Sequence, residues 1–540
     1  MKYSSQPHTM PLELFASDLC QLSKQNRWVQ LGDSLPWDTI EQIYNARLNN
    51  GKRGAGNKPA RMIIGALLIK HKMNLSDYET IEAIRENPYM QYMLGLKEFT
   101  DKAVFDPSLF VTIRKRLGNS DFNDMSESLL KLQVERHKEQ VRQQKIKDSS
   151  DSQNNNDKIN PHHGGTSSDI RAASPRVSSS SDADTSHKGI LKMDATCSDA
   201  EVRYPTDLDL LHDGCEVLER IIDRISKNAS VERPGTNFKT VHAIYAKTIK
   251  KKNKPGKELK RCTEYLLGAL SKSIRTVFDL VARNTTDCFM GLKRRDKKLF
   301  FTILDMWRQQ KSMFDTGTHS CENRIISIFQ PHVRPIVRGK ARSKVEFGSK
   351  IGVSVVGGYA FIDHFSWDAY NECDDLMVHL RAYKKRFGCL PQLVEADKIY
   401  LNRKNRRIMK LLHIEVGGRP LGSPPKDVDE EAYEAKMAKY SGERNEVEAT
   451  FGTGKRVYRA NNIRAKLDDT GDAWCAACYF VKNVMKFLKG LLYALLQLFN
   501  IANRIVFTRS GEKSYKYLFI IFHIRCLRCT TLRMGSRHTY

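Results

Sequence analysis

The residues best suited to chemistry lie between Tyr440 and Lys455, in a segment that reads YSGERNEVEATFGTGK. The preceding residues 427–439 are rich in Ala, Glu and Lys, which favour a helix. At roughly 100° per residue, four side chains would share one face of that helix, within an arc of about 80° around its axis: Tyr440, Arg444, Glu448 and Lys455. An aromatic ring, a guanidinium, a carboxylate and an ammonium on one face suit a site that handles phosphate and a metal ion.

Two further acids of this segment point elsewhere on the same helix. Glu443 and Glu446 lie about 140° and 200° from Glu448, so Glu448 is the acid of the candidate face. Exposed helices with opposite charges at i and i+4 are common, and the segment alone also fits such a solvated helix. The choice between the two interpretations depends on the rest of the chain.

Two short apolar runs end in an acid and predict strands. Residues 190–196 (ILKMDAT) predict a strand with Asp194 near its carboxyl end. An acid that closes a strand into a turn is the ordinary alternative. Three other acids lie close by in the sequence. The pattern alone therefore does not exclude, as the functional acid of this segment, Asp199, Asp207 or Asp209.

The second apolar run is residues 392–397 (QLVEAD), which carries two acids. Glu395 and Asp397 alternate onto the same face of a strand, so periodicity does not choose between them. A two-residue Gly357-Gly358 turn between residues 350–356 and 359–365 predicts a β-hairpin.

The pattern R-x3-E-x6-K with an upstream Tyr resembles the Y-R-E-K signature of DDE transposases from bacterial insertion sequences. In that family the Glu is the third metal-binding carboxylate. Three residues separate Tyr440 from Arg444 here, where the family has two. The text DAT at 194–196, followed by PTD, resembles the first catalytic block, and A-D-x2-Y resembles the second. The resemblance therefore selects Asp194 and Asp397.

Other segments resemble the same family. Segments at 75–79, 87–91 and 110–117 are similar to its N-terminal domain, which binds the terminal repeats of the element. Pro59 predicts the start of one helix, and a capping box at Ser76–Glu79 predicts the start of the next. From the residues alone, these helices around the 72–75 connection fit either a helix-turn-helix or a plain helical hairpin. Between 334 and 350 the resemblance implies that three lysines face substrate: Lys340, Lys344 and Lys350.

The resemblance implies an α/β fold: a ribonuclease H-like catalytic domain with a large basic helical insertion, preceded by an all-α N-terminal domain. We predict a helical DNA-binding domain over 1–140 and a catalytic domain over 189–486, with the insertion at about 208–335. Residues 141–188 lack Phe, Trp and Tyr and are rich in Ser and Asn, so we predict a disordered linker. Residues 487–540 are predicted to form an apolar helix and a basic tail.

The formal net charge of +27 predicts a polyanionic partner. Two basic clusters, at 247–261 and 293–298, fit phosphate contacts. A basic protein of another kind, such as a ribosome-associated factor, is the alternative. The polar start of the chain predicts no signal peptide, and the apolar stretch 490–503 is too short to span a bilayer.

The cysteines do not predict a metal or disulfide framework. Twelve scattered Cys fit a reducing compartment. Cys475-x2-Cys478 and Cys526-x2-Cys529 resemble half-sites of a zinc ribbon, but the gap between the pairs is far longer than usual. The sequence also has no phosphate-binding loop of the G-x4-G-K-[ST] type, so ATP is not implied.

Together, these features predict a transposase that cleaves DNA at the ends of an insertion sequence and joins the 3′ hydroxyls to target DNA. Asp194, Asp397 and Glu448 would hold Mg²⁺, with Mn²⁺ as a substitute. The predicted partners are double-stranded DNA, as terminal inverted repeats and target, and further copies of the chain. The predicted location is the cytoplasm at the nucleoid, without a membrane. The alternatives are a catalytically decayed repressor and a ribonuclease H-like nuclease without strand transfer.

Overall fold

The computed structural model describes residues 18–48, 56–151, 187–253, 255–284, 287–337, 345–422 and 429–509, and omits the side chains of 18, 20, 144–151 and 492–509. Two compact units divide at Val484/Met485. In the second unit, only the later part of helix α16 (Gly471–Arg509) is described. Lys340, Lys344, Cys526 and Cys529 lie outside the described residues, as does the predicted basic tail from residue 510 onward.

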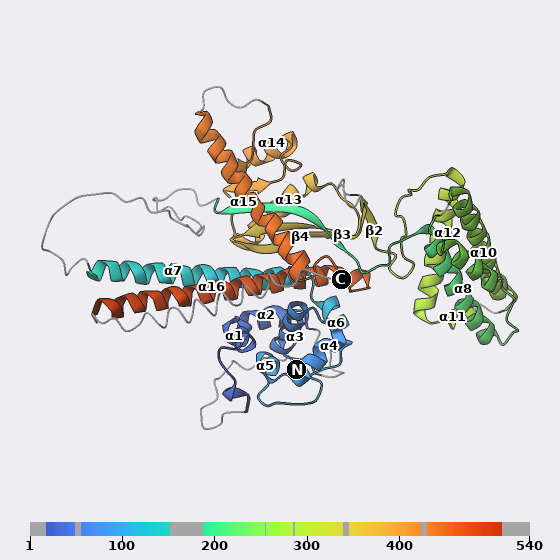
Figure 1. Ribbon diagram of the computed structural model, residues 1–540, viewed down its shortest axis with the longest axis horizontal. Coiled ribbons are helices and arrows are strands. Elements are labelled where there is room, and N and C mark those ends of the chain that lie inside the picture. The colour runs from blue at the N-terminus through green and yellow to red at the C-terminus, as the bar shows by residue number, and fades with distance from the viewer. Residues whose placement is uncertain are drawn as a thin grey trace. The chain divides into compact units, whose positions relative to one another are not determined.

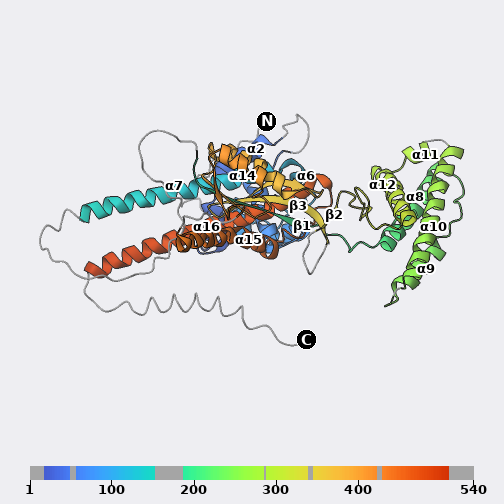
Figure 2. The same cartoon turned by 90° about the horizontal axis from the view of Figure 1, so that it is seen from above.

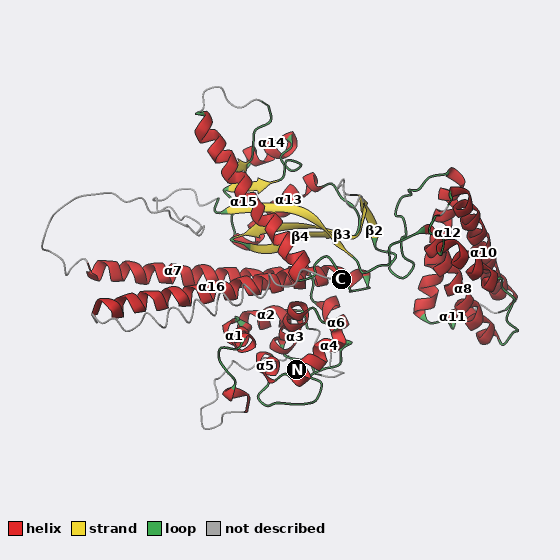
Figure 3. Ribbon diagram, viewed as in Figure 1, coloured by secondary structure: helices red, strands yellow, loops and turns green. Residues whose placement is uncertain are grey.

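Short helices followed by one long helix make up the N-terminal part of the chain (Figures 1 and 3). The expected helix starts at Pro59 and Ser76 are confirmed. Ser76 forms a reciprocal capping box with Glu79, and Asn74 ends the preceding helix in the left-handed conformation at φ 59°. The elements are η2 (Asp18–Gln21), α1 (Arg27–Ser34), α2 (Trp37–Ala46), α3 (Ala60–Met73), α4 (Asp77–Glu86), α5 (Pro88–Met93), α6 (Leu109–Arg116) and α7 (Asn119–Asp151).

Helix α7 corrects the predicted start of the linker at residue 141. The helix continues to Asp151. Its sequence beyond residue 135 is rich in Glu, Lys, Gln and Arg, which are strong helix formers even without apolar contacts. The rest of the predicted linker, from 152 to 186, lies outside the described residues.

A mixed sheet forms the centre of the α/β part. Its order is β2-β3-β1-β5-β6, and β4 also pairs with β3. Strand β1 pairs antiparallel with β3 and parallel with β5, so both its edges are hydrogen-bonded. The strands are β1 (Ile190–Asp199), β2 (Arg334–Val337), β3 (Val345–Val356), β4 (Tyr359–Ser366), β5 (Leu393–Ala396) and β6 (Glu415–Gly417).

The sheet confirms the predicted hairpin and corrects the position of Asp194. Gly357 and Gly358 adopt φ of 56° and 79° between β3 and β4, a conformation that favours glycine. Asp194 was expected near the carboxyl end of its strand, but β1 continues to Asp199. The strand extends because β3 supplies partners for Thr196 to Asp199, beyond the apolar run that the sequence pattern shows.

Helices cover the two faces of this sheet. One face packs an apolar cluster that includes Leu191, Met193, Leu380 and Tyr400. Helix α15 packs on the face that carries Lys192 and the residues alternating with it. The remaining elements are η3 (Glu372–Asp375), α13 (Leu376–Phe387), α14 (Arg403–Leu411), α15 (Glu430–Val457) and η4 (Asp468–Thr470).

Asparagine side chains complete the outer edge of β4. Asn483 of α16 accepts from the Ala360 amide and donates to the Ala360 carbonyl, at 2.9 and 2.7 Å. Asn123 of α7 does the same for Ile362, whose carbonyl also accepts from Asn119. Buried backbone groups need such partners, so these amides close an edge that would otherwise need another strand.

A helical insertion with its own apolar core separates β1 from β2. Its core includes Leu211, Ile221, Leu266 and Ile303, contributed by three different helices. The insertion was expected over about 208–335; its helices end at Thr316, and β2 begins at Arg334. The helices, coloured green in Figures 1 and 2, are α8 (Asp207–Ala229), α9 (Phe238–Ile249), α10 (Gly256–Arg283), α11 (Asp287–Met290) and α12 (Arg294–Thr316).

None of the described helices combines the length and the apolar character needed to cross a lipid bilayer.

A buried ion network joins β4 to α13. The fully buried Asp363 carboxylate accepts from His379 Nδ1 at 2.7 Å and forms an ion pair with Arg386. Burial favours the neutral acid, but the Arg386 charge and the His379 hydrogen bond outweigh it and lower the pKa of Asp363. Arg386 also donates to Ser354 Oγ at 3.2 Å on the neighbouring strand.

Replacement of Arg386 by Met should destabilise this part of the chain by about 3–5 kcal/mol, because it leaves a buried carboxylate without its cation. The free energy of unfolding in urea measures the loss. Arg381→Met, at an exposed position of the same helix, is the matched control. Equal stability of the two variants would show that the network does not stabilise the fold.

Burial of His71 in α3 makes stability depend on pH. The ring is 4% exposed, lies 4.9 Å from the Trp474 ring and has Nδ1 3.4 Å from Cys478 Sγ. Burial, together with the charges of Lys70 and Arg114, lowers the pKa of His71 to about 3. The unfolded chain binds this proton near pH 6.5, so the folded state loses stability as the pH falls below that value.

Between pH 7 and pH 5, His71 should account for a loss of about 2 kcal/mol in the free energy of unfolding. His71→Gln removes the titrating group. Between pH 7 and pH 5, the free energy of unfolding of this variant should therefore fall by about 2 kcal/mol less than that of the wild type. His319→Gln changes an exposed histidine and should retain the wild-type dependence. Identical pH profiles for wild type and His71→Gln would contradict the assignment.

Candidate functional site

Helix α15 presents different residues to the sheet and to solvent. Asp429 caps its start by accepting from the Glu431 and Ala432 amides. Val447 and Gly454 are buried, and a Cβ at Gly454 would come within 3.0 Å of the Tyr479 ring. This glycine therefore permits close packing against α16, and α15 continues past it to Val457.

Arg444 links two of the sequence-predicted acids. Its Nη1 lies 3.4 Å from Asp397 Oδ1, and its Nη2 lies 3.2 Å from Glu448 Oε1. The Asp397 and Glu448 side chains are 49% and 56% exposed, so their free oxygens remain open to solvent and to a ligand. One guanidinium thus holds together carboxylates from the end of β5 and from α15.

Asp194 belongs to the same group by strand register. Lys192 pairs with Glu395, and Met193 with Ala396, so the next step of this parallel register brings Asp194 beside Asp397. Burial raises the pKa of Asp194 to about 6; the Ala195 amide opposes this shift, and the charges of Glu372 and Asp397 add to it. The crowding of negative charge at Asp194 would be relieved by a cation.

The two acids that periodicity could not separate have different surroundings. Glu395 is fully buried, and its nearest cation is Lys192 at 3.9 Å, whereas Asp397 lies half-exposed beside Arg444. Burial, with a smaller effect of Glu443, raises the pKa of Glu395 to about 8. Lys192 also pairs with Glu446 at 3.0 Å, which ties β1 to the side of α15 away from Glu448.

Tyr440 and Lys455 lie apart from the Arg444 ion pairs. The Tyr440 hydroxyl donates to Glu415 Oε1 at 2.7 Å, on β6, and the ring is 8% exposed. Lys455 is half-buried near Cys475. The Lys455 charge slightly lowers the pKa of the Cys475 thiol, against the larger effect of burial. The structure therefore brings together Asp194, Asp397, Arg444 and Glu448, and places these two elsewhere on α15.

Glu372 is a neighbour of the site that the sequence analysis missed. It lies in η3 and acts on the pKa of Asp194 through its charge. Lys350, expected to face substrate, pairs with Glu372 at 3.0 Å and donates to the Tyr370 carbonyl at 2.7 Å. The acidic run ECDD after the hairpin was the available signal, but its distance in sequence from both strands hid the contact.

Cys475 and Cys478 do not form a metal site in the described residues. Both are buried in α16, and burial raises the pKa of the Cys475 thiol to about 12. A protonated thiol is a poor zinc ligand.

Comparisons with known proteins identify two separate matches. Residues 18–116 match the family described as Transposase domain (DUF772), and residues 394–484 match the family described as Transposase DDE domain. The second match contains Asp397, Arg444 and Glu448, while Asp194 lies outside it.

One curated relative and the solved structures were also compared. The chain is 30% identical over 132 residues to an uncharacterized protein, ORF8 in the nfe locus of Rhizobium meliloti. This alignment covers 24% of the chain and 61% of the relative's length. No solved structure matches the chain. The chain therefore contains two segments that match transposase domains, the second of them a DDE domain.

Proposed function

We propose that the chain cleaves DNA at the ends of an insertion sequence and joins the 3′ hydroxyls to target DNA. The observation that carries this proposal is the convergence of Asp194, Asp397 and Glu448, from two strands and a helix, around Arg444. Acids so far apart in sequence meet only because the sheet brings them together. Such a group of carboxylates can hold divalent cations that support phosphoryl transfer.

The catalytic part is proposed to have a ribonuclease H-like fold. Three antiparallel strands, β1, β3 and β4, continue into β5 and β6, which run parallel to β1. The carboxylates lie on neighbouring parallel strands and on a helix against one face of the sheet. This arrangement supports the fold that the Y-R-E-K resemblance implies, with the helical insertion between β1 and β2.

Asp194, Asp397 and Glu448 fit a site for Mg²⁺, with Mn²⁺ as a substitute. All three offer carboxylate oxygens, the ligands that both ions accept, and the charges of Glu372 and Asp397 add to the effect of burial on Asp194. In the described residues, these carboxylates are more widely spaced than the ligands of a single bound ion, with the Arg444 guanidinium between two of them. Bound Mg²⁺ would activate the attacking hydroxyl and stabilise charge on the leaving oxygen.

The protein's own contribution is to position phosphate beside these acids. Arg444 has a planar guanidinium that can bind two phosphate oxygens at once when a cation takes over the carboxylates. Lys192 and its partners Glu395 and Glu446 hold β1, β5 and α15 in register. This support keeps the acids in place while the charge of the site changes.

The basic helical insertion is proposed to contact the DNA backbone. Lys247, Lys250 and Lys257 are exposed at and after the end of α9, and Lys293 and Arg295 are exposed at the start of α12. We further propose that two or more copies of the chain assemble on the element ends at the nucleoid. The N-terminal helices, within the first matched domain, would bind the terminal repeats.

Removal of any one acid should abolish cleavage but leave end binding. Asp194→Asn, Asp397→Asn and Glu448→Gln should each reduce strand cleavage of labelled end DNA about a thousandfold, since a metal ion contributes several kcal/mol to the transition state. Glu434→Gln, an acid that is 50% exposed on the same helix, is the matched control. Glu446 is a poorer control because it pairs with Lys192 beside Asp194.

Cleavage that survives in Glu448→Gln would refute the assignment of this site. End binding without cleavage by the wild-type chain would favour a decayed repressor. Cleavage without joining of 3′ hydroxyls would favour a nuclease. Measuring binding, cleavage and joining on the same DNA separates the three outcomes.

Neutralising basic residues of the insertion should weaken binding to every DNA sequence. In Lys250→Gln/Lys257→Gln, the slope of log affinity against log salt should fall by about 2, because each phosphate contact contributes about 0.9. The matched control is Arg308→Gln/Lys311→Gln, which removes equal charge from two residues already paired with acids on α12. An equal change of slope in both variants would assign the effect to net charge rather than to contacts.

A further inference from the structure

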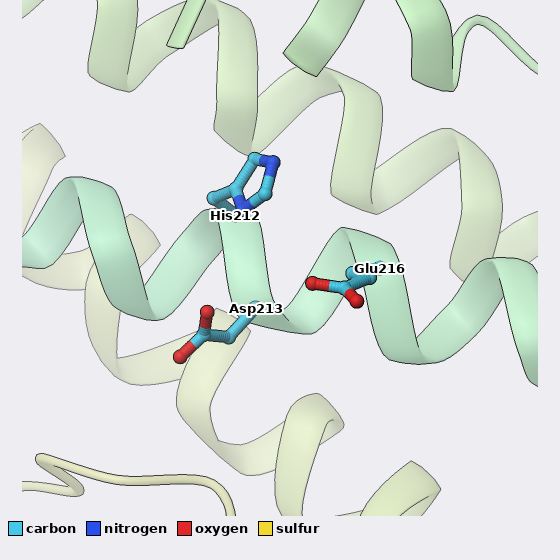
Figure 4. Close-up of side chains that lie close together, drawn as sticks. All are labelled: His212, Asp213 and Glu216. Carbon is cyan, nitrogen blue, oxygen red and sulfur yellow. The ribbon is translucent and has the colours of Figure 1, made fainter. Parts of the chain in front are cut away.

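A second group of polar side chains lies in the helical insertion, on α8. His212, Asp213 and Glu216 each offer one ligand atom, and these atoms all lie within 4.8 Å of one another. Figure 4 shows the three side chains projecting from neighbouring positions of α8. Positions i and i+4 share one helix face, and the neighbouring i+1 side chain reaches round to it. Across the described residues, no other group of three His, Cys, Asp or Glu meets this spacing.

Neighbouring side chains orient the His212 imidazole. Its Nε2 lies 3.0 Å from Nδ1 of His242 on α9, and the Tyr245 ring stacks on it at 4.0 Å and 13°. His212 is 6% exposed, so the ring has little freedom to turn. With Nε2 engaged by His242, Nδ1 is the nitrogen left for a ligand.

The carboxylates retain free oxygens. Asp213 uses Oδ2 to accept from Arg203 at 3.0 Å, which leaves Oδ1. Glu216 is exposed and makes no hydrogen bond or ion pair with the described residues around it. The group therefore offers one imidazole nitrogen and two or three carboxylate oxygens, with room for water.

We propose that His212, Asp213 and Glu216 bind a divalent transition-metal ion of the zinc type. An imidazole nitrogen with carboxylate oxygens suits zinc, whereas Mg²⁺ prefers oxygen ligands alone. His242 serves as the hydrogen-bond partner that fixes the ligating tautomer, as is usual for metal-bound histidine. The ion would link the start of α8 to α9 through the His212–His242 bond, so it is a site for stability rather than for the DNA chemistry of Asp194, Asp397 and Glu448.

Cobalt titration of the full-length chain tests this site. Co²⁺ stands in for zinc, and excess Mg²⁺ occupies all-oxygen sites. Co²⁺ bound by nitrogen and oxygen absorbs weakly in the visible range, whereas Co²⁺ bound by thiolates absorbs strongly in the near ultraviolet. We expect one Co²⁺ per chain with visible bands only. Glu216→Gln, and also His242→Phe, should weaken binding roughly ten- to hundredfold.

The matched control is Glu264→Gln, which changes an exposed acid on α10 of the same insertion and should bind Co²⁺ as the wild type does. Because Glu216 and His242 are exposed, both variants are expected to fold, and circular dichroism checks this. Unchanged Co²⁺ affinity in Glu216→Gln would overturn the proposal. A wild-type chain that shows no visible absorption bands with Co²⁺ would also overturn it. Thiolate bands alone would assign the bound ion to cysteines.

Discussion

The pairing of β1 on both edges is the constraint on which the rest of the structure depends. β3 binds one edge antiparallel and β5 binds the other parallel, although the whole helical insertion separates β1 from β3 in sequence. Strand β3 pairs with Lys192 to Asp199 and β5 with Ile190 to Met193, so every residue of β1 has a partner and its register is strongly determined. That register sets Asp194 beside Asp397. A shift by one residue would send Asp194 to the apolar face beside Leu380 and Tyr400.

Charge balance then decides how α15 lies on this sheet. Lys192 pairs with Glu446, and Arg444 pairs with Asp397 and Glu448. These contacts use residues a few positions apart on one helix, so they resist rotation of the helix about its axis. The buried pair of Lys192 and Glu395 links β1 to β5 and adds little to stability, since desolvation offsets much of its attraction.

The edge of β4 shows how the N-terminal helices are joined to the sheet. Asn119 and Asn123 from α7, and Asn483 from α16, bind backbone groups of β4 in the way that another strand would. The same helices pack apolar rings against each other, with Phe122 and Phe480 at 5.8 Å. Helix α7 follows the first matched segment, and His71 within that segment contacts Cys478 of the second, so residues of both matched domains belong to one folded unit.

The sequence by itself determined the local elements and the types of the acting residues. Capping residues and Pro59 predicted helix starts, Gly357-Gly358 predicted the hairpin, and the motifs selected Asp194, Asp397, Arg444 and Glu448. These features depend on neighbouring residues, whose propensities are visible in the sequence. The predicted roles of these residues are proposals that the cleavage experiment tests.

Only the tertiary structure decided which side chains meet. Helical periodicity placed Tyr440 on the face of Glu448, yet Tyr440 bonds to Glu415, because β6 lies beneath that turn of α15. Glu372 and the His212–His242 contact join segments whose separation in sequence carries no signal. Strand alternation treats Glu395 and Asp397 alike. Their difference arises because one lies under a packed helix, where burial favours the neutral acid, and the other lies at an open strand end beside a guanidinium.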